Sequence, residues 1–314
     1  MREGSLPVLR LVLTLLAFLS WTSCSTVPVI RVPHVSRLSE SGFQGTAWAP
    51  DGATILAVGI PAAPSTQSNV FRIGFPSGDV VRITLAPGQF SNPSWSPDGS
   101  QVTVTVDLDG IWLLDWPGGN LSYLSGGEAA VWSRDGQELL VYAGNLSQPD
   151  TDQRVLRMID LEGNVRRSIQ IGELSTVERD VEYVSGLSLS EDGTRLAYSI
   201  TVPKSGHNLH ESYIADLVSG TVLRFRPDER TGFLSWAPER DDVAYIRFGG
   251  DDYVGELIIA DADGACVFKP ALPGEISSIS WGPDGRRMAF VYYGAVYVLD
   301  VASARLDSPP GGGC

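Results

Sequence analysis

The chain has 314 residues, 43% of them apolar, and carries a formal charge of −14 at neutral pH. The apolar content is sufficient for a packed core, and the 34 glycines and 20 prolines favour many turns over long helices. The acidic balance argues against nucleic acid as a partner, because phosphate binding requires clustered lysines and arginines.

The N-terminal residues predict an export signal. Basic residues precede Leu11–Trp21, an apolar stretch that is too short to span a bilayer. The Trp-Thr-Ser-Cys that follows resembles the lipobox of bacterial lipoproteins, in which a small residue precedes the cysteine that receives lipid. The resemblance implies a signal peptide over residues 1–23 and lipidation of Cys24, although Trp21 stands where that family has an aliphatic residue. Ordinary secretion is the alternative.

From residue 43 onwards, a phrase of the type Trp-Ser-Pro-Asp-Gly recurs six times. Successive copies begin 37 to 57 residues apart, which is the spacing of propellers and other repeat folds. The first position of the phrase is filled by Trp48, Trp95, Trp132, Leu189, Trp236 and Trp281. The position seven residues later is always apolar. We call the first position the register position, and we expect its indoles to pack between repeats.

Each copy predicts a four-stranded antiparallel unit. A strand ends near the register position, Pro-Asp-Gly makes a tight turn, and a second strand follows, as in Gln101–Thr105. A third strand is an apolar run closed by Asp, as in Ile111–Asp115, and a glycine turn leads to a fourth. One such sheet cannot bury both faces alone, whereas a ring of six can. The sequence therefore predicts an all-β fold, a six-bladed β-propeller of four-stranded antiparallel blades over residues 43–306.

The copies resemble the WD-related repeats of the TolB family, whose hallmark is the Trp-Ser-Pro-Asp-Gly turn. The resemblance covers Phe43–Leu306 and implies the propeller fold and a capacity to bind other proteins. In copies three and four, Arg134 and Glu191 stand where the family has proline, and the fifth copy lacks Asp-Gly after Pro238. We therefore expect another turn geometry in these three copies. TolB proteins carry an additional α/β domain before the propeller, for which residues 24–42 are too few, so their role in an envelope-spanning complex does not carry over.

Residues 24–42 are expected to form a lipid anchor and tether with a closing strand. We favour addition of Val29–Val32 to the last blade, and the alternative is that Ala304–Leu306 completes it. Residues 307–314 are expected to be a flexible tail. Whether Cys266 pairs with Cys314 stays open, because spacing in sequence does not decide it.

Long connections are expected on one face of the ring. The turns between strands one and two and between strands three and four share a face that we call the short-turn face, and the other connections lie on the loop face. Four long loop-face connections come from neighbouring blades: Ala143–Arg154, Gly172–Val184, Pro203–Ser212 and Phe248–Gly255. They predict an acidic rim for a cationic or polar partner, made of Asp150, Asp152, Glu178, Asp180, Glu182, Tyr183, His207, His210, Glu211, Asp251, Asp252 and Tyr253. Solvated acidic loops are the plainer interpretation.

His207, His210 and Glu211 could together hold zinc or another transition metal. Other carboxylates would have to complete such a site, because the usual ligand spacing is missing. The competing interpretation is that these are exposed polar loop residues, and we expect no cofactor.

A prolyl-oligopeptidase-like serine peptidase is not expected, because the chain contains neither a Gly-x-Ser-x-Gly elbow nor a segment for a hydrolase sheet. The sequence favours a non-catalytic lipoprotein of the bacterial cell envelope whose propeller binds a protein or glycan partner. The alternative is a metal-dependent lyase or lactonase that uses the funnel of the loop face.

Overall fold

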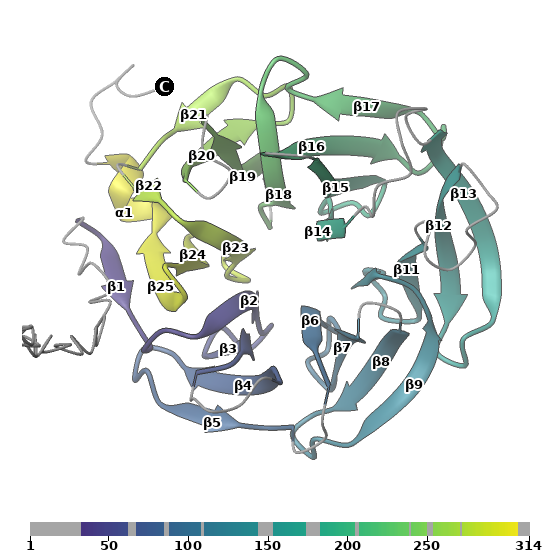
Figure 1. Ribbon diagram of the computed structural model, residues 1–314, viewed down its shortest axis with the longest axis horizontal. Helices are drawn as coiled ribbons and strands as arrows, with labels where there is room; N and C mark the ends of the chain where they lie inside the picture. The colour runs from purple at the N-terminus through teal and green to yellow at the C-terminus, as the bar shows by residue number, and fades with distance from the viewer. Residues whose placement is uncertain are drawn as a thin grey trace, which may run out of the picture.

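The six-bladed β-propeller is confirmed by the computed structural model, in which six antiparallel sheets surround a common centre (Figure 1). Among the described residues, no helix is long and apolar enough to cross a membrane. The structure describes residues 33–61, 67–84, 88–107, 110–143, 153–173, 183–204, 207–238, 240–249, 254–270 and 272–306.

The first three blades each contain four strands, ordered in space as in sequence. The innermost strand of each blade ends at the register tryptophan. Blade one contains β2 (Phe43–Trp48), β3 (Thr54–Gly59), β4 (Asn69–Gly74) and β5 (Val80–Arg82). Blade two contains β6 (Phe90–Trp95), β7 (Gln101–Val106), β8 (Gly110–Asp115) and β9 (Leu121–Gly126). Blade three contains β10 (Ala129–Trp132), β11 (Glu138–Ala143), β12 (Gln153–Asp160) and β13 (Val165–Glu173).

The last three blades repeat this order, with an extra strand in blade five and a closing strand in blade six. Blade four contains β14 (Tyr183–Leu189), β15 (Arg195–Lys204), β16 (His207–Asp216) and β17 (Val222–Phe225). Blade five contains β18 (Arg230–Trp236), β19 (Asp242–Phe248), β20 (Gly255–Asp261), β21 (Cys266–Phe268) and β22 (Pro273–Gly274), which pairs with β20. Blade six contains β23 (Ile276–Trp281), β24 (Arg287–Tyr292), β25 (Ala295–Asp300) and β1 (Val35–Arg37), and α1 (Val301–Leu306) follows it.

In five of the six copies, the turn after the register position is an Asp-Gly turn that glycine makes favourable. Gly99 has a φ of +72° and donates its N–H to Ser96 O, while Asp98 accepts from the N–H of Ser100. The expectation of a different geometry in copies three and four is wrong, because Gly136 and Gly193 have φ values of +70° and +69° and donate in the same way. The turn geometry is maintained by the positive φ of glycine and by the hydrogen bonds that Asp accepts, so the turn forms without proline.

The hydrophobic core consists of six clusters, one at each junction between neighbouring blades. Each register residue packs in the cluster that its blade shares with the preceding one. Trp132, for example, lies in one cluster with Ile111 and Leu113 of blade two and is 4% exposed. The prediction that these indoles pack between blades is confirmed.

Five of the six junctions also carry a polar contact between inner strands. At three junctions, the register indole donates to a backbone carbonyl of the preceding blade: Trp95 to Ala47 O at 3.2 Å, Trp132 to Ser94 O at 3.2 Å and Trp281 to Ser235 O at 3.3 Å. At two others, a serine hydroxyl of the preceding blade accepts the backbone N–H of the register tryptophan: Ser280 from Trp48 at 2.8 Å and Ser188 from Trp236 at 2.9 Å. These bonds satisfy backbone groups on the free edges of the inner strands.

The ring closes through the N-terminal segment. β1 pairs with β25, with Val35 opposite Leu299 and Arg37 opposite Tyr297. Closure from the N-terminal side is the alternative we favoured, although Val29–Val32 lie outside the described residues. The alternative that Ala304–Leu306 forms a strand is wrong, because Asp300 accepts from the N–H and hydroxyl of Ser303 and caps α1 there.

We expect closure to depend on β1 and not on the residues before it. A variant lacking residues 1–37 should melt more than about 4 °C below a variant lacking residues 1–32, because it uncovers the edge of β25 and removes Val35 from the core. Thermal unfolding followed by circular dichroism measures the difference. Equal melting temperatures would contradict closure by β1.

The polar junction contacts predict different costs for two matched substitutions. Trp132→Phe removes an indole N–H that is hydrogen-bonded, whereas Trp236→Phe removes one that has no partner among the described residues. Both indoles are 4% exposed, so the packing losses are similar. Trp132→Phe should therefore lower the free energy of unfolding by about 1–3 kcal/mol more than Trp236→Phe.

Urea unfolding of both variants measures this difference. Arg195 Cζ lies 4.5 Å from the centre of the Trp236 ring, and a phenylalanine ring retains this cation–π contact in weaker form. Trp236→Phe therefore also costs some stability, which makes the difference between the two variants smaller but does not change its sign. A larger loss for Trp236→Phe would show that the indole–carbonyl bond does not stabilise the junction.

Candidate functional site

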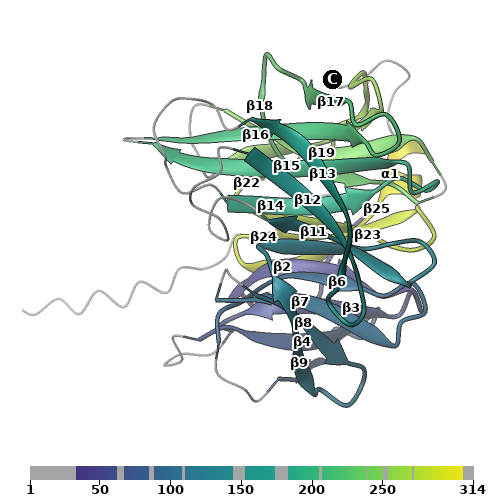
Figure 2. The same ribbon diagram turned by 90° about the vertical axis from the view of Figure 1, so that its right-hand side faces the viewer.

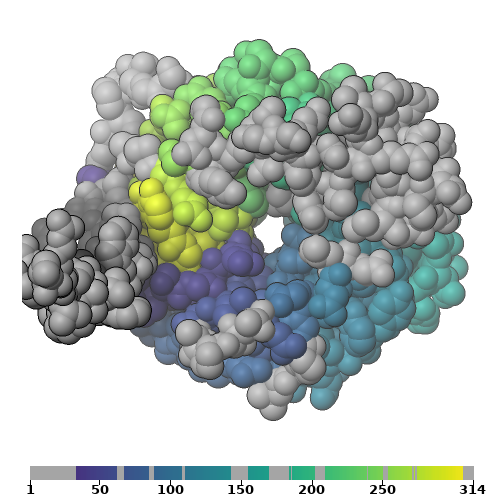
Figure 3. Space-filling model, viewed as in Figure 1, coloured from purple at the N-terminus to yellow at the C-terminus, as the bar shows by residue number. Residues whose placement is uncertain are grey.

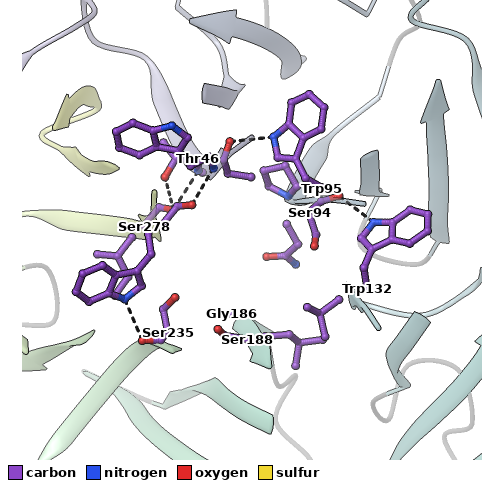
Figure 4. A pocket seen from close by; sticks show the side chains of 18 of the residues that line it. Thr46, Ser94, Trp95, Trp132, Gly186, Ser188, Ser235 and Ser278 are labelled. Atoms are coloured by element: carbon purple, nitrogen blue, oxygen red, sulfur yellow. Dashed lines mark hydrogen bonds between the residues drawn. The ribbon is translucent and has the colours of Figure 1, made fainter. Parts of the chain in front are cut away.

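A central channel runs between the inner strands of all six blades. Its volume is about 550 Å³, which is within the range of small-molecule sites. The space-filling view shows its opening at the centre of the ring (Figure 3). The close-up places Thr46, Ser94, Ser188, Ser235 and Ser278 around it (Figure 4).

The wall of this channel is mixed polar and apolar and almost uncharged. Its described lining consists mainly of hydroxyl-bearing, aliphatic and aromatic residues, including five tryptophans. The only ionisable side chains among the described lining residues are Arg134 and Glu191. The channel therefore offers hydrogen bonds without a free charge to balance an ionic ligand.

Arg134 and Glu191 form an ion pair across the junction of blades three and four. Arg134 Nη2 lies 2.8 Å from Glu191 Oε2, and Arg134 Nε donates to Ser190 O at 3.2 Å. At this junction Leu189 replaces the register tryptophan, so no indole N–H is available. The two residues that depart from the repeat pattern thus provide the polar contact that the indole provides elsewhere. Both side chains are about half exposed, so the pair contributes modestly to stability.

Two inner strands carry a bulge that includes a residue of positive φ. In β6 and β18 the pairing with the second strand shifts between Ser91 and Ser94 and between Gly232 and Ser235. The residues at the start of these bulges, Asn92 and Phe233, have φ values of +46° and +56° and line the channel. A phenylalanine rarely adopts this conformation, so the surrounding structure must hold it there.

Most residues of the predicted acidic rim lie outside the described residues: Asp150, Asp152, Glu178, Asp180, Glu182, Asp251, Asp252 and Tyr253. Of the rest, Tyr183 begins β14 and His207 begins β16. His210 and Glu211 follow in β16. The rim as a binding surface stays a prediction.

The segment Pro203–Ser212 is not a loop, contrary to the prediction. It belongs to β15 and β16, two ten-residue strands that pair from Arg195 opposite Asp216 to Lys204 opposite His207. Figure 2 shows both strands reaching beyond the inner strands of the ring. The Ser-Gly dipeptide at 205–206 is a two-residue turn signal that would have indicated this hairpin.

His210 and Glu211 point to opposite faces of β16, because side chains alternate along a strand. His210 is 7% exposed, stacks on Phe248 of blade five with ring centroids 4.2 Å apart, and its Nδ1 lies 3.0 Å from Thr201 Oγ1. Glu211 accepts from the hydroxyl of Tyr213 and pairs with Arg224 at 3.1 Å. These two side chains therefore cannot bind one ion together in this arrangement. No group of three metal-ligating side chains occurs in the part of the chain that the structure describes.

Asp-Gly turns surround the short-turn mouth of the channel. Hydrogen bonds from the Ser96 hydroxyl and from Ser100 lower the pKa of Asp98 to about 2, and bonds from the Ser190 hydroxyl and from Thr194 lower the pKa of Asp192 to about 2. The hydrogen bonds of these turns thus stabilise the ionised form of each Asp side chain more than its neutral form.

Asp98→Asn and Asp192→Asn should reduce stability at pH 7 and have less effect in acid. Because the folded pKa lies below the ordinary value of 3.8, the carboxylate stabilises the fold above pH 3.8 and loses this effect as pH falls towards 2. Urea midpoints at pH 7, 5 and 3 measure the difference from the natural chain. Asp228→Asn is a control, because that carboxylate accepts no turn hydrogen bond among the described residues. A difference in urea midpoint between variant and natural chain that stays constant from pH 7 to pH 3 would contradict this account.

Comparisons with solved structures agree with the propeller fold. The TolB structure from Agrobacterium tumefaciens aligns with a TM-score of 0.58 at 16% identity, over 84% of this chain and 96% of that one. TolB from Acinetobacter baumannii aligns with a TM-score of 0.55 at 14% identity, over 84% of this chain and 64% of that one. An oligogalacturonate lyase in complex with manganese aligns with a TM-score of 0.53 at 13% identity, over 86% of this chain and 79% of that one.

No family model matches the sequence, and no curated protein matches it. At these identities the likeness establishes the fold class, a six-bladed β-propeller with TolB proteins among its structural neighbours.

The channel residues were not singled out from the sequence. Serine at the position before the register residue, as in Ser94, Ser188, Ser235 and Ser280, was the available signal. It had no evident meaning until the ring brought these residues to a common opening.

Proposed function

We propose that this protein is a non-catalytic lipoprotein of the bacterial cell envelope whose propeller binds a protein or glycan partner outside the cytoplasm. The observation that carries the binding role is the uncharged, hydroxyl-rich channel, in which the only described ionisable pair is neutralised by mutual contact. A wall of this kind can bind a partner by hydrogen bonds, and its described lining holds no ionisable side chain besides that pair.

The alternative, a metal-dependent lyase or lactonase, has one favourable observation, the likeness in fold to a manganese-bound lyase. The described residues that face the channel supply no metal-ligating set, so such an activity would need ligands from residues outside the description. Binding is therefore the function that the described site favours.

Export is supported by two features. Cys266 in β21 is disulfide-bonded, and its partner lies outside the described residues. Disulfides persist in oxidising compartments outside the cytoplasm. The signal-like residues 1–23 and Cys24 point in the same direction.

Cys24→Ser should release the protein from the membrane. If Cys24 carries lipid, the natural protein fractionates with membranes, whereas the variant appears in the soluble envelope or medium fraction. Immunoblotting of the fractions measures this. A variant that is processed and still fractionates with membranes would show that another feature attaches the protein.

Cross-linking in intact cells, followed by capture of the protein, tests the binding role. One variant blocks the channel at Gly186, where an added Cβ would lie 3.8 Å from its nearest neighbour, so Gly186→Phe adds a side chain without a clash at Cβ. A second variant neutralises the predicted rim at Glu178, Asp180, Glu182, Asp251 and Asp252. Tyr123→Ala, on the exposed outer strand β9, is the control.

We expect at least one partner to be lost in the channel or rim variant and retained in the control. Recovery of the same partners from all variants would contradict binding at either place.

A further inference from the structure

We propose that the central channel binds an uncharged oligosaccharide between Asn92 and Phe233. This inference rests on the proposed binding role and names the class of ligand that the channel takes. It follows from the placement of an amide, an aromatic ring and two serine hydroxyls on opposite walls.

Blades two and five are the two blades whose described inner strands contain a residue of positive φ, and in a ring of six they lie opposite each other (Figure 1). Asn92 and Phe233 both stand three residues before the register position, so they lie at the same depth of the channel. Both adopt a positive φ at a bulge that opposes two residues to one on the second strand. The two bulges therefore place an amide and an aromatic ring at equivalent positions across the opening.

Phe233 is held in this conformation and is partly buried. It packs against the hydrophobic cluster at the junction of blades five and six and is also one of the residues that line the channel. On the opposite wall, Asn92 Nδ2 donates to Glu128 O at 2.9 Å, which fixes the amide and leaves Oδ1 as its second polar atom.

Serine hydroxyls continue these two walls towards the short-turn mouth. Ser94 and Ser235 are equivalent residues of blades two and five, and the backbone carbonyl of each is already used by the indole of the next blade. Their hydroxyls make no hydrogen bond within the described residues, and neither does the buried hydroxyl of Ser91. Each of the Ser94 and Ser235 hydroxyls can donate one hydrogen bond and accept two.

This combination fits a saccharide better than an ion. A sugar ring offers an apolar C–H face for Phe233 and hydroxyls that both donate and accept, as serine and asparagine do. A carboxylate or ammonium ligand would lose its hydration in the channel without meeting an opposite charge, because Arg134 and Glu191 are paired with each other. The uncharged wall therefore selects an uncharged ligand.

Calorimetric titration of the purified protein tests this inference with four tetrasaccharide probes. The uncharged probes are cellotetraose, maltotetraose and tetra-N-acetylchitotetraose, and the anionic probe is tetragalacturonate. We expect at least one uncharged probe to bind with one site per chain and tetragalacturonate to bind at least tenfold more weakly. An uncharged capped Gly-Ser peptide is a fifth probe, and tighter binding of this peptide than of every saccharide would overturn the proposal.

Phe233→Gly and Asn92→Gly are the matched variants. Glycine adopts the positive φ of both positions without strain, so each variant keeps the bulge while it removes one recognition group. We expect each to weaken saccharide binding at least tenfold with a retained cooperative melting transition, while Tyr123→Ala binds as the natural protein does. If Phe233→Gly does not fold, the saccharide affinity of Asn92→Gly alone tests the inference.

Absence of binding by all three uncharged probes, or affinities unchanged in a folded glycine variant, would overturn the inference. The proposed binding role is judged separately, because cross-linking in cells would still recover a protein partner. Failure of both experiments would remove the role itself.

Discussion

Six sheets arranged in a ring leave six inner edges, and each edge carries backbone N–H and C=O groups that no further strand covers. Unsatisfied groups of this kind are costly when buried. At five of the six junctions the neighbouring blade supplies a partner, either an indole N–H that donates to a carbonyl or a serine hydroxyl that accepts from an N–H. The same register residues also fill the apolar clusters between blades, so packing and hydrogen bonding are achieved by one set of positions.

This arrangement determines what the channel can bind. The groups that satisfy the inner edges are indoles and hydroxyls, which are neutral, and they occupy positions that face or border the opening. The described charged side chains that line the opening, Arg134 and Glu191, are paired with each other. An uncharged, hydrogen-bonding wall is thus a consequence of how the ring is held together, and it favours ligands that exchange hydrogen bonds over ligands that carry charge.

The departures from the repeat pattern have structural explanations. Arg134 and Glu191 replace prolines that the turn does not need, and they meet at the junction where Leu189 leaves no indole N–H. The long β15–β16 hairpin replaces a predicted loop and places His210 against Phe248 of the next blade. In both cases a residue that departs from the repeat pattern contacts a residue of a neighbouring blade.

The sequence by itself determined the number of sheets, their four-stranded antiparallel form and the apolar register, because these depend on local turn chemistry and on side-chain alternation within each copy. The packing of Trp132 between blades and the place of Gly99 in a turn could be predicted in this way. Only the tertiary structure decided which residues of different copies meet: Arg134 with Glu191 across a junction, and Asn92 opposite Phe233 across the channel. Those relations depend on the ring having six blades and on the strand β1 that closes it, since closure sets which copies are neighbours and which face each other.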